Sequence, residues 1–161
     1  MARAEDNYLM TQKTFERLVL KLSQIETDSK QVGKAMGEAG GTSDHHDNFA
    51  YEQYARDYGA IMSQLGILQD KIKNAQIIVP NTNNEIIGIG HEVKLKFLLD
   101  IEICSYTILG PSDNDPTNGW ISCLTPLATA ILGKHTRDTI VYKTPGGTEK
   151  ILILDFKPGN F

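Results

Sequence analysis

The chain has 161 residues, of which 40% are hydrophobic and 22% charged, as in ordinary folded proteins of one domain or two small ones. Its net charge of −4 does not indicate a general nucleic-acid-binding surface. No apolar run approaches the roughly 18 residues that suggest a membrane span, and the first nine residues lack the apolar core of a signal peptide. Cys104 and Cys123 lie far apart, without CxxC spacing. We therefore expect reduced core thiols and a cytoplasmic protein.

Two stretches of the first half repeat apolar residues about every 3.5 positions, the pattern of helices packed along one another in a coiled coil. The first seam comprises Phe15, Leu18, Leu22, Ile25, Val32 and Met36, with Ser29 as a polar interruption. The second comprises Tyr51, Tyr54, Tyr58, Ile61, Leu65, Leu68, Ile72 and Ala75. The seams mirror each other, pairing Phe15 with Ile72, Leu22 with Leu65, and Met36 with Tyr51. They predict an antiparallel helical hairpin over residues 1–78, with its tip at Asp44.

The ends of the first helix are indicated by a cap and by glycines. Thr11 is a good N-cap, so the helix should run from Gln12 to about Met36. We expect it to be ended by the three glycines that follow, because glycine favours the left-handed conformation found just past helices: Gly37, Gly40 and Gly41. The tyrosines of the second helix are interpreted as hairpin core, since the seam accounts for all three.

The predicted tip, residues 41–48, is polar and acidic and contains the run Asp44-His45-His46-Asp47-Asn48. Lys and Arg are absent between Lys34 and Arg56, whereas four carboxylates fall there: Glu38, Asp44, Asp47 and Glu52. A phosphate backbone would repel such a tip unless a metal ion stood between them. The second helix should be capped by Asp44, Asp47 or Asn48 and run to about Ala75.

The second half changes to the pattern of strands after a turn-rich linker at residues 80–84. Strand candidates are residues 92–97, 101–109, 120–124, 139–144 and 149–156, with a turn at 144–147 joining the last two. Only residues 126–132 look helical, with Pro126 at the first position and Gly133 as terminator. We therefore expect an α+β chain in which residues 79–161 form a small antiparallel sheet domain with one short helix.

Four segments in this order resemble the bacterial GreA/GreB family of transcript-cleavage factors. The opening, Met10-Thr11 and the Phe15 seam, is similar to the family's start. Asp44-x-x-Asp47-Asn48-x-x-Tyr51 resembles its tip pattern, Asp-x-x-Glu-Asn-x-x-Tyr. The other two are Ile121-Ser122 with Thr125-Pro126-Leu127-Ala128-x-Ala130-Ile131-Leu132-Gly133-Lys134, and the turn Thr144-Pro145-Gly146-Gly147. The chain departs from the family at Asp47, one methylene shorter than Glu, at His45 and His46, and at Arg137, where the family commonly has Gly.

The resemblance implies a coiled-coil hairpin followed by a domain with an FKBP-like fold. It implies that the second domain docks at the rim of the RNA polymerase secondary channel, and we centre the rim contacts on Thr125, Pro126 and Leu127. The hairpin would enter the channel, where the tip helps the polymerase's own active site cut backtracked RNA. The chain would thus be an accessory factor rather than an enzyme, a monomer away from membranes, and would reach the nascent RNA 3′ end only indirectly.

The resemblance assigns Asp44 and Asp47 to a Mg²⁺ ion shared with the polymerase active site and not stably bound by the chain alone. Two-metal phosphodiester hydrolysis needs a second Mg²⁺ and an in-line water, and Mg²⁺ commonly takes one or two protein carboxylates. Asn48 would orient nearby groups by hydrogen bonds. The residues alone favour a plainer role, with Asp44 as an N-cap and Asp47 as a first-turn charge; the family match reverses that preference. A transition-metal site with His45 and His46 is less favoured, because adjacent residues on a helix rarely point the same way.

Three functions remain open at this point. The chain is a factor that stimulates cleavage by RNA polymerase, or a related regulator that enters the same channel and inhibits or redirects the enzyme. The third is an FKBP-like prolyl isomerase or chaperone. The second half has few aromatics to line a proline pocket, with Trp120 as its only Trp, so the third is disfavoured.

Overall fold

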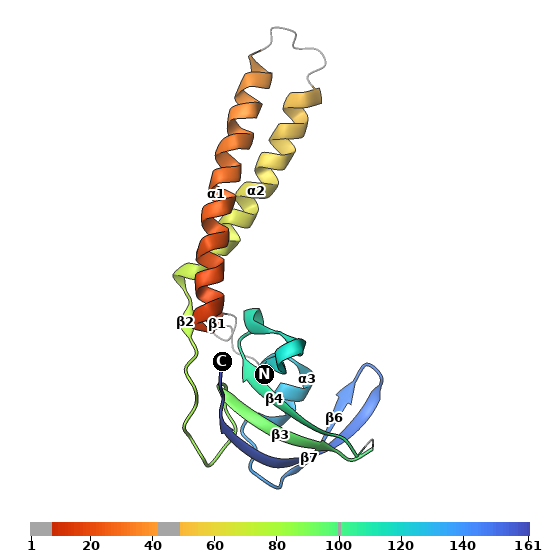
Figure 1. The fold of residues 1–161 in the computed structure, drawn as a ribbon. Coiled ribbons are helices and arrows are strands. Elements are labelled where there is room, and N and C mark those ends of the chain that lie inside the picture. The colour runs from red at the N-terminus through yellow and green to blue at the C-terminus, as the bar shows by residue number, and fades with distance from the viewer. Residues whose placement is uncertain (1–7, 42–48, 100) are drawn as a thin grey trace. The chain divides into compact units, whose positions relative to one another are not determined.

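The computed structural model describes residues 8–41, 49–99 and 101–161 (Figure 1). The chain divides into two compact units, one formed by Phe15–Asn74 and the other by residues 8–14 together with Ala75–Phe161. The predicted fold class is confirmed: a helical hairpin is followed by a sheet domain with one short α-helix. The domain boundary after residue 78 and the FKBP-like assignment stay predictions.

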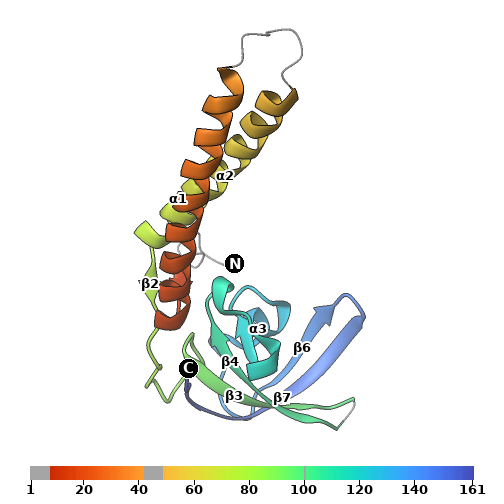
Figure 2. The same ribbon diagram turned by 45° about the horizontal axis from the view of Figure 1, so that its top comes forward.

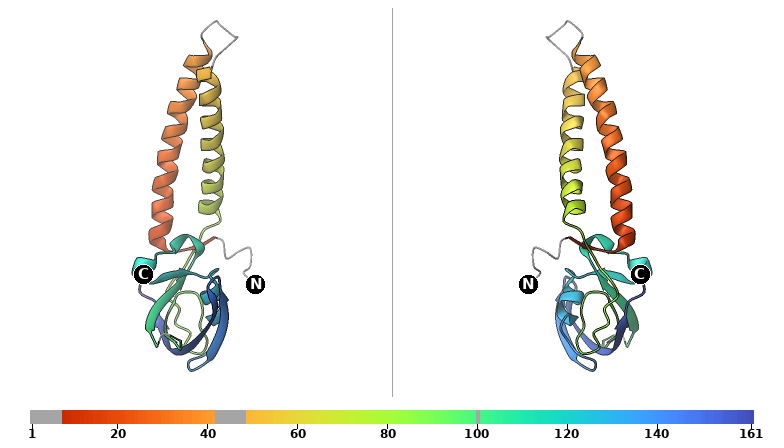
Figure 3. Two further views of the ribbon diagram at one scale, coloured as in Figure 1. Left: turned by 90° about the vertical axis from the view of Figure 1, so that its right-hand side faces the viewer. Right: turned by 90° about the vertical axis from the view of Figure 1, so that its left-hand side faces the viewer.

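The hairpin consists of α1 (Gln12–Gly40) and α2 (Phe49–Lys73), which lie side by side and run in opposite directions (Figure 3). The Thr11 hydroxyl accepts a hydrogen bond from the Thr14 N–H at 3.2 Å, so the predicted N-cap is confirmed. The predicted end of α1 at about Met36 is wrong, because the helix continues through Gly37 to Gly40. The expected cap of the second helix lies outside the described residues.

Glycines of α1 and tyrosines of α2 pack against each other in the half of the hairpin nearer the tip. A Cβ added to Gly33 would lie 3.3 Å from the Tyr58 ring, and one added to Gly40 would lie 3.3 Å from the Tyr51 ring. Tyr51 and Tyr58 thus lie along the hairpin seam, as predicted, but Tyr51 is 42% exposed and so is not core. Tyr51 meets Gly40 one helical turn beyond its predicted partner Met36. In the other half, Ile25 and Leu68, which belong to the two predicted seams, line one groove.

The sheet has the strand order β5-β4-β3-β7-β6, and each neighbouring pair is antiparallel except β4 and β5, which are parallel. The predicted antiparallel sheet is therefore mixed. Its strands are β3 (His91–Phe97), β4 (Ile103–Leu109), β5 (Trp120–Ser122), β6 (Thr139–Thr144) and β7 (Gly147–Pro158). The short helix α3 (Pro126–Ile131) lies where expected. Two 3₁₀ helices, η2 (Pro111–Asp113) and η3 (Pro116–Asn118), were not predicted.

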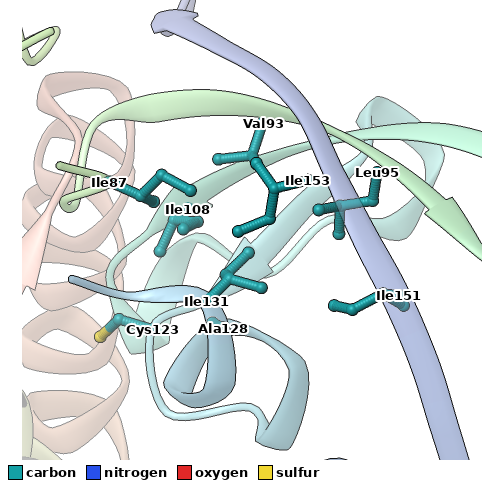
Figure 4. Close-up of a cluster of buried hydrophobic side chains, with 9 residues drawn as sticks. All are labelled: Ile87, Val93, Leu95, Ile108, Cys123, Ala128, Ile131, Ile151 and Ile153. Carbon is teal, nitrogen blue, oxygen red and sulfur yellow. The ribbon is translucent and has the colours of Figure 1, made fainter. Parts of the chain in front are cut away.

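The core of this unit lies between α3 and one face of the sheet (Figures 2 and 4). It comprises Ile87, Val93, Leu95, Ile108, Cys123, Ala128, Ile131, Ile151 and Ile153. Alternation along the strands directs one set of side chains inward and the other outward. Val93 and Leu95 are fully buried, whereas Lys94 between them is exposed on the opposite, outer face. Cys104 and Cys123 do not form a disulfide, as predicted; Cys123 is buried in the core, whereas Cys104 is only partly buried.

Residues 9–11, which precede α1, belong to the sheet unit and are held there by strand pairing and hydrogen bonds. The short strand β1 (Leu9–Met10) pairs in parallel with β2 (Gln76–Ile77), and the Met10 side chain is fully buried. The Thr11 N–H and hydroxyl donate to the Asp113 carboxylate at 2.7 to 3.1 Å. A Cβ at Gly110 would overlap the Leu9 carbonyl, so glycine is required there.

Candidate functional site

The residues assigned to chemistry at the tip lie outside the described residues. These are Asp44, Asp47 and Asn48, together with His45 and His46. The described chain on either side ends with Gly41 after α1 and resumes at Phe49 in α2. The catalytic and metal-binding roles of the tip therefore stay predictions.

The two described carboxylates nearest the tip are held in surface ion pairs on their own helices. Glu38 lies 3.8 Å from the Lys34 ammonium, and Glu52 lies 3.7 Å from the Arg56 guanidinium. Both pairs join residues four apart and are well exposed, so each contributes about 0.5 kcal/mol or less. Within the described ranges, no group of three or more His, Cys, Asp or Glu side chains is placed to hold a metal.

Phe49, the first described residue after the tip, is 73% exposed. It lies off the apolar seam, so the periodicity gave it no role. The only signal in the sequence was its place directly after Asn48, where a large apolar side chain at a helix start has no core to enter.

The predicted docking loop is built around the start of α3. The Thr125 hydroxyl accepts a hydrogen bond from the Ala128 N–H at 3.3 Å and donates to the Ser122 carbonyl at 2.8 Å, which caps α3 and closes the turn before it. Leu127 is partly buried against the core, whereas Pro126 is exposed. Of the three predicted contact residues, Pro126 is thus the one whose side chain is most available.

Sequence reasoning missed Leu124, which lies just before this loop and is 39% exposed. Its N–H donates to the Ser122 hydroxyl at 3.1 Å, which fixes the backbone at this position. The loop therefore presents two apolar side chains, Leu124 and Pro126, on a backbone held by the Ser122 and Thr125 hydroxyls. Such a preordered surface suits docking, because little freedom is lost on binding.

Comparisons with known proteins cover both units. Residues 8–77 match the family model described as "Transcription elongation factor, N-terminal", and residues 82–158 match "Transcription elongation factor, GreA/GreB, C-term". Transcription elongation factor GreA of Geobacillus kaustophilus is 31% identical over 155 residues, which cover 95% of this chain and 98% of the relative. The chain belongs to the GreA/GreB family of transcription elongation factors.

Other GreA/GreB proteins extend the comparison. GreA of Oceanobacillus iheyensis is 32% identical over 145 residues, covering 89% of this chain and 92% of that protein. Among solved structures, the crystal structure of GreA factor homolog 1 from Thermus thermophilus covers 91% of this chain and 96% of that chain. It is 25% identical, with a TM-score of 0.42. The described helices of this GreA/GreB chain include none with the length and apolarity required to cross a bilayer.

Proposed function

We propose that this chain binds bacterial RNA polymerase through its sheet unit, inserts the hairpin into the secondary channel and stimulates the polymerase's own cleavage of backtracked RNA. The observation that carries the proposal is the family match over both units, with relatives named transcription elongation factor GreA. The Asp-x-x-Asp-Asn-x-x-Tyr pattern at the predicted tip supports the cleavage step in particular. The chain would act in the cytoplasm as a monomeric accessory factor, with no catalytic cycle of its own.

The length of the hairpin supports this role. The 29 residues of α1 correspond to about 43 Å at 1.5 Å per residue, and α2 has 25 residues. Two helices packed along one seam form a long, narrow element, which can carry a few side chains deep into a channel. The glycine–tyrosine packing near its end lets the helices approach closely there.

The tip would act through its oxygen ligands. Two carboxylates and an amide oxygen are a donor set that suits Mg²⁺, a hard cation that prefers oxygen. Asp44 and Asp47 would hold the ion, with Asn48 orienting the attacking water or the RNA by hydrogen bonds. When bound, Mg²⁺ would supply charge stabilisation to the cleavage reaction. Asp47 has less reach than the family's Glu, so Asp44 would carry the larger share of binding.

The test is a cleavage assay on stalled elongation complexes with RNA labelled at its 5′ end. Adding the wild-type chain in the presence of Mg²⁺ should shorten the RNA faster than polymerase alone does. The altered tip, with Asp47 and the His45-His46 pair, favours one alternative, a channel-binding regulator without cleavage activity. That alternative predicts no shortening and a reduced rate of nucleotide addition in the same complexes.

A further inference from the structure

The turn between β3 and β4 exposes an unusual amount of apolar surface. Leu99 is 69% exposed, Ile101 is 74% exposed and Ile103 is 52% exposed, and Leu98 is 36% exposed. Strand connections are normally made by Gly, Asn, Asp, Pro and Ser. Exposed aliphatic side chains at this turn contribute little to folding, because they are not removed from water.

Ile101 also has an unfavourable backbone conformation at this turn. Its backbone has φ of 57°, in the left-handed region. This conformation is a genuine outlier for a β-branched residue, because its Cβ approaches the following carbonyl oxygen. An exposed Ile held in a strained conformation is not explained by stability, and strained residues tend to occur where function requires them.

Strand register continues this apolar surface onto the outer face of the sheet. Ile103 pairs with Lys96, and the Leu98 N–H donates to the Lys150 carbonyl at 2.9 Å. Lys150 in turn pairs with Val141, which is 60% exposed. We call the set Leu98, Leu99, Ile101, Ile103 and Val141 the hairpin patch, after the β-hairpin that β3 and β4 form. It belongs to the sheet unit and not to the helical hairpin.

The patch lies beside a concentration of positive charge. The outward positions of β3, β6 and β7 carry five lysines against two carboxylates, in a chain of net charge −4: Lys94, Lys96, Lys143, Lys150 and Lys157, with Glu92 and Asp155. One further carboxylate, the exposed Glu102, lies in the turn itself. Lys157 lies 3.3 Å from Glu92. The other four lysines form no salt bridge with any residue that the structure describes.

The positive charge of these lysines favours some binding partners of the patch over others. A second copy of the chain would bring its own lysines against these, so self-association is disfavoured. Single-stranded nucleic acid is bound by lysine or arginine grooves that also offer exposed aromatic rings for base stacking. Here the aromatic side chains of β3, β4, β6 and β7 pack against the core instead: Phe97, Tyr106, Tyr142 and Phe156. A protein surface with an apolar centre and an acidic rim fits best.

We propose that the hairpin patch and its lysines form a second docking surface, which binds an apolar, acid-rimmed surface of RNA polymerase. This inference rests on the proposed function, since it names polymerase as the partner. The patch lies on the outer face of the sheet and its β3–β4 turn, whereas α3 packs against the inner face. Contacts at the patch therefore add to those at Pro126 and do not replace them.

The test measures the affinity of the full-length chain, fluorescently labelled, for core RNA polymerase. The variant Leu99→Ser with Ile101→Asn removes two apolar side chains, and Asn accepts the left-handed conformation better than Ile. We expect this variant to unfold at the same or a higher temperature and to bind about tenfold or more weakly, the loss typical of removed apolar anchors. The matched control is Val79→Asn, at a position 69% exposed in the same unit and outside the patch, which should bind within about twofold of wild type.

A second variant tests the charge. Lys96→Gln with Lys150→Gln should weaken binding at low salt and flatten its dependence on salt, because fewer ion pairs are screened. Patch variants that bind polymerase as tightly as wild type would overturn the docking surface and leave the proposed function standing. A wild-type chain that does not bind polymerase would overturn both. Patch variants that lose affinity for free RNA but keep their affinity for polymerase would also overturn the inference, because the surface would then be assigned to nucleic acid.

Discussion

His91 is a buried titratable group whose environment favours the neutral imidazole. Its side chain is fully buried, and Nδ1 accepts a hydrogen bond from the Gly88 N–H at 2.9 Å. Nε2, which then carries the proton, is buried without a hydrogen-bond partner among the described residues. The ring packs on Phe156 at 5.0 Å between centroids. Burial lowers the pKa of His91 from 6.5, and the residue holds the linker before β3 against the sheet.

This environment predicts acid-sensitive stability. Because the folded-state pKa lies below the unfolded value, the stabilisation is fully present above about pH 6.5 and is lost as the pH falls from there toward the folded pKa. The slope reaches at most about 1.4 kcal/mol per pH unit. Thermal unfolding followed by circular dichroism should show a larger loss between pH 7 and pH 5 in wild type than in His91→Asn, whose amide oxygen can still accept from Gly88. Equal losses in the two proteins would assign the acid sensitivity to other groups; His135→Gln, at an exposed position, is the control.

The backbone conformation at Arg137 shows why glycine suits this position in the family. Its φ is 73°, again in the left-handed region, and its N–H donates to the Ile153 carbonyl at 2.8 Å. Glycine, which the family commonly has at this position, adopts that conformation without steric cost. The loop keeps its shape here because Asp138 accepts a hydrogen bond from the His135 N–H at 2.8 Å. Sequence alone showed the substitution but not the backbone conformation that makes glycine suitable.

At the scale of elements, the hairpin glycines divide into two kinds. Gly33 and Gly40 lie against tyrosine rings, whereas Gly59 and Gly66 of α2 have nothing within 4 Å of an added Cβ. The first kind makes room for the opposite helix. The second kind only weakens its own helix, by about 0.8–1 kcal/mol per glycine relative to Ala.

The two kinds should respond differently to alanine. Gly66→Ala should stabilise the hairpin by about 0.5–1 kcal/mol, because it adds helix propensity and meets open space. Gly33→Ala should gain much less or lose stability, because its Cβ presses on Tyr58. Urea unfolding monitored by helix signal compares the two variants with wild type. An equal gain in both variants would show that the Tyr58 ring moves aside freely, against the packing described.

The elements that periodicity could predict were those with a long, regular apolar pattern. The seams predicted both helices and the faces that carry Ile25 and Leu68, because burial on one face forces a repeat. The end of α1 was missed because Gly37 and Gly40 were weighed as helix breakers; only the position of Tyr51 across the hairpin shows that Gly40 is a packing residue. The parallel β4–β5 pairing was missed because strand direction depends on η2 and η3, which have no periodic signal.

The candidate site was predictable only where a motif carried it. Thr125 was named through the family resemblance and Pro126 also as a proline at a helix start, and the structure adds Leu124 because exposure is a property of the fold. The hairpin patch had a sequence signal in Leu98-Leu99, but an apolar pair at a strand end reads equally well as core. Its exposure, and the strain at Ile101, follow from where the turn falls in the sheet.

At the scale of the molecule, two units share the proposed work. Docking is assigned to the sheet unit, through Pro126 and the hairpin patch, and the chemistry to the end of the hairpin. The buried Met10 and the hydrogen bonds from Thr11 to Asp113 belong to the sheet unit. Experiments that separate the two roles are therefore best made with substitutions in the full chain, which leave these contacts in place.

The most direct measurement is the rate of transcript cleavage in stalled elongation complexes supplied with the variant Asp44→Asn with Asp47→Asn. Asn caps helices about as well as Asp, so the start of α2 should survive, while the negative charge that a hard cation requires is lost. The account predicts that stimulation of cleavage disappears while the affinity for polymerase stays nearly unchanged, and that Asp47→Glu keeps or raises activity. A cleavage rate for the Asn variant equal to that of wild type would contradict the metal-binding role of the tip.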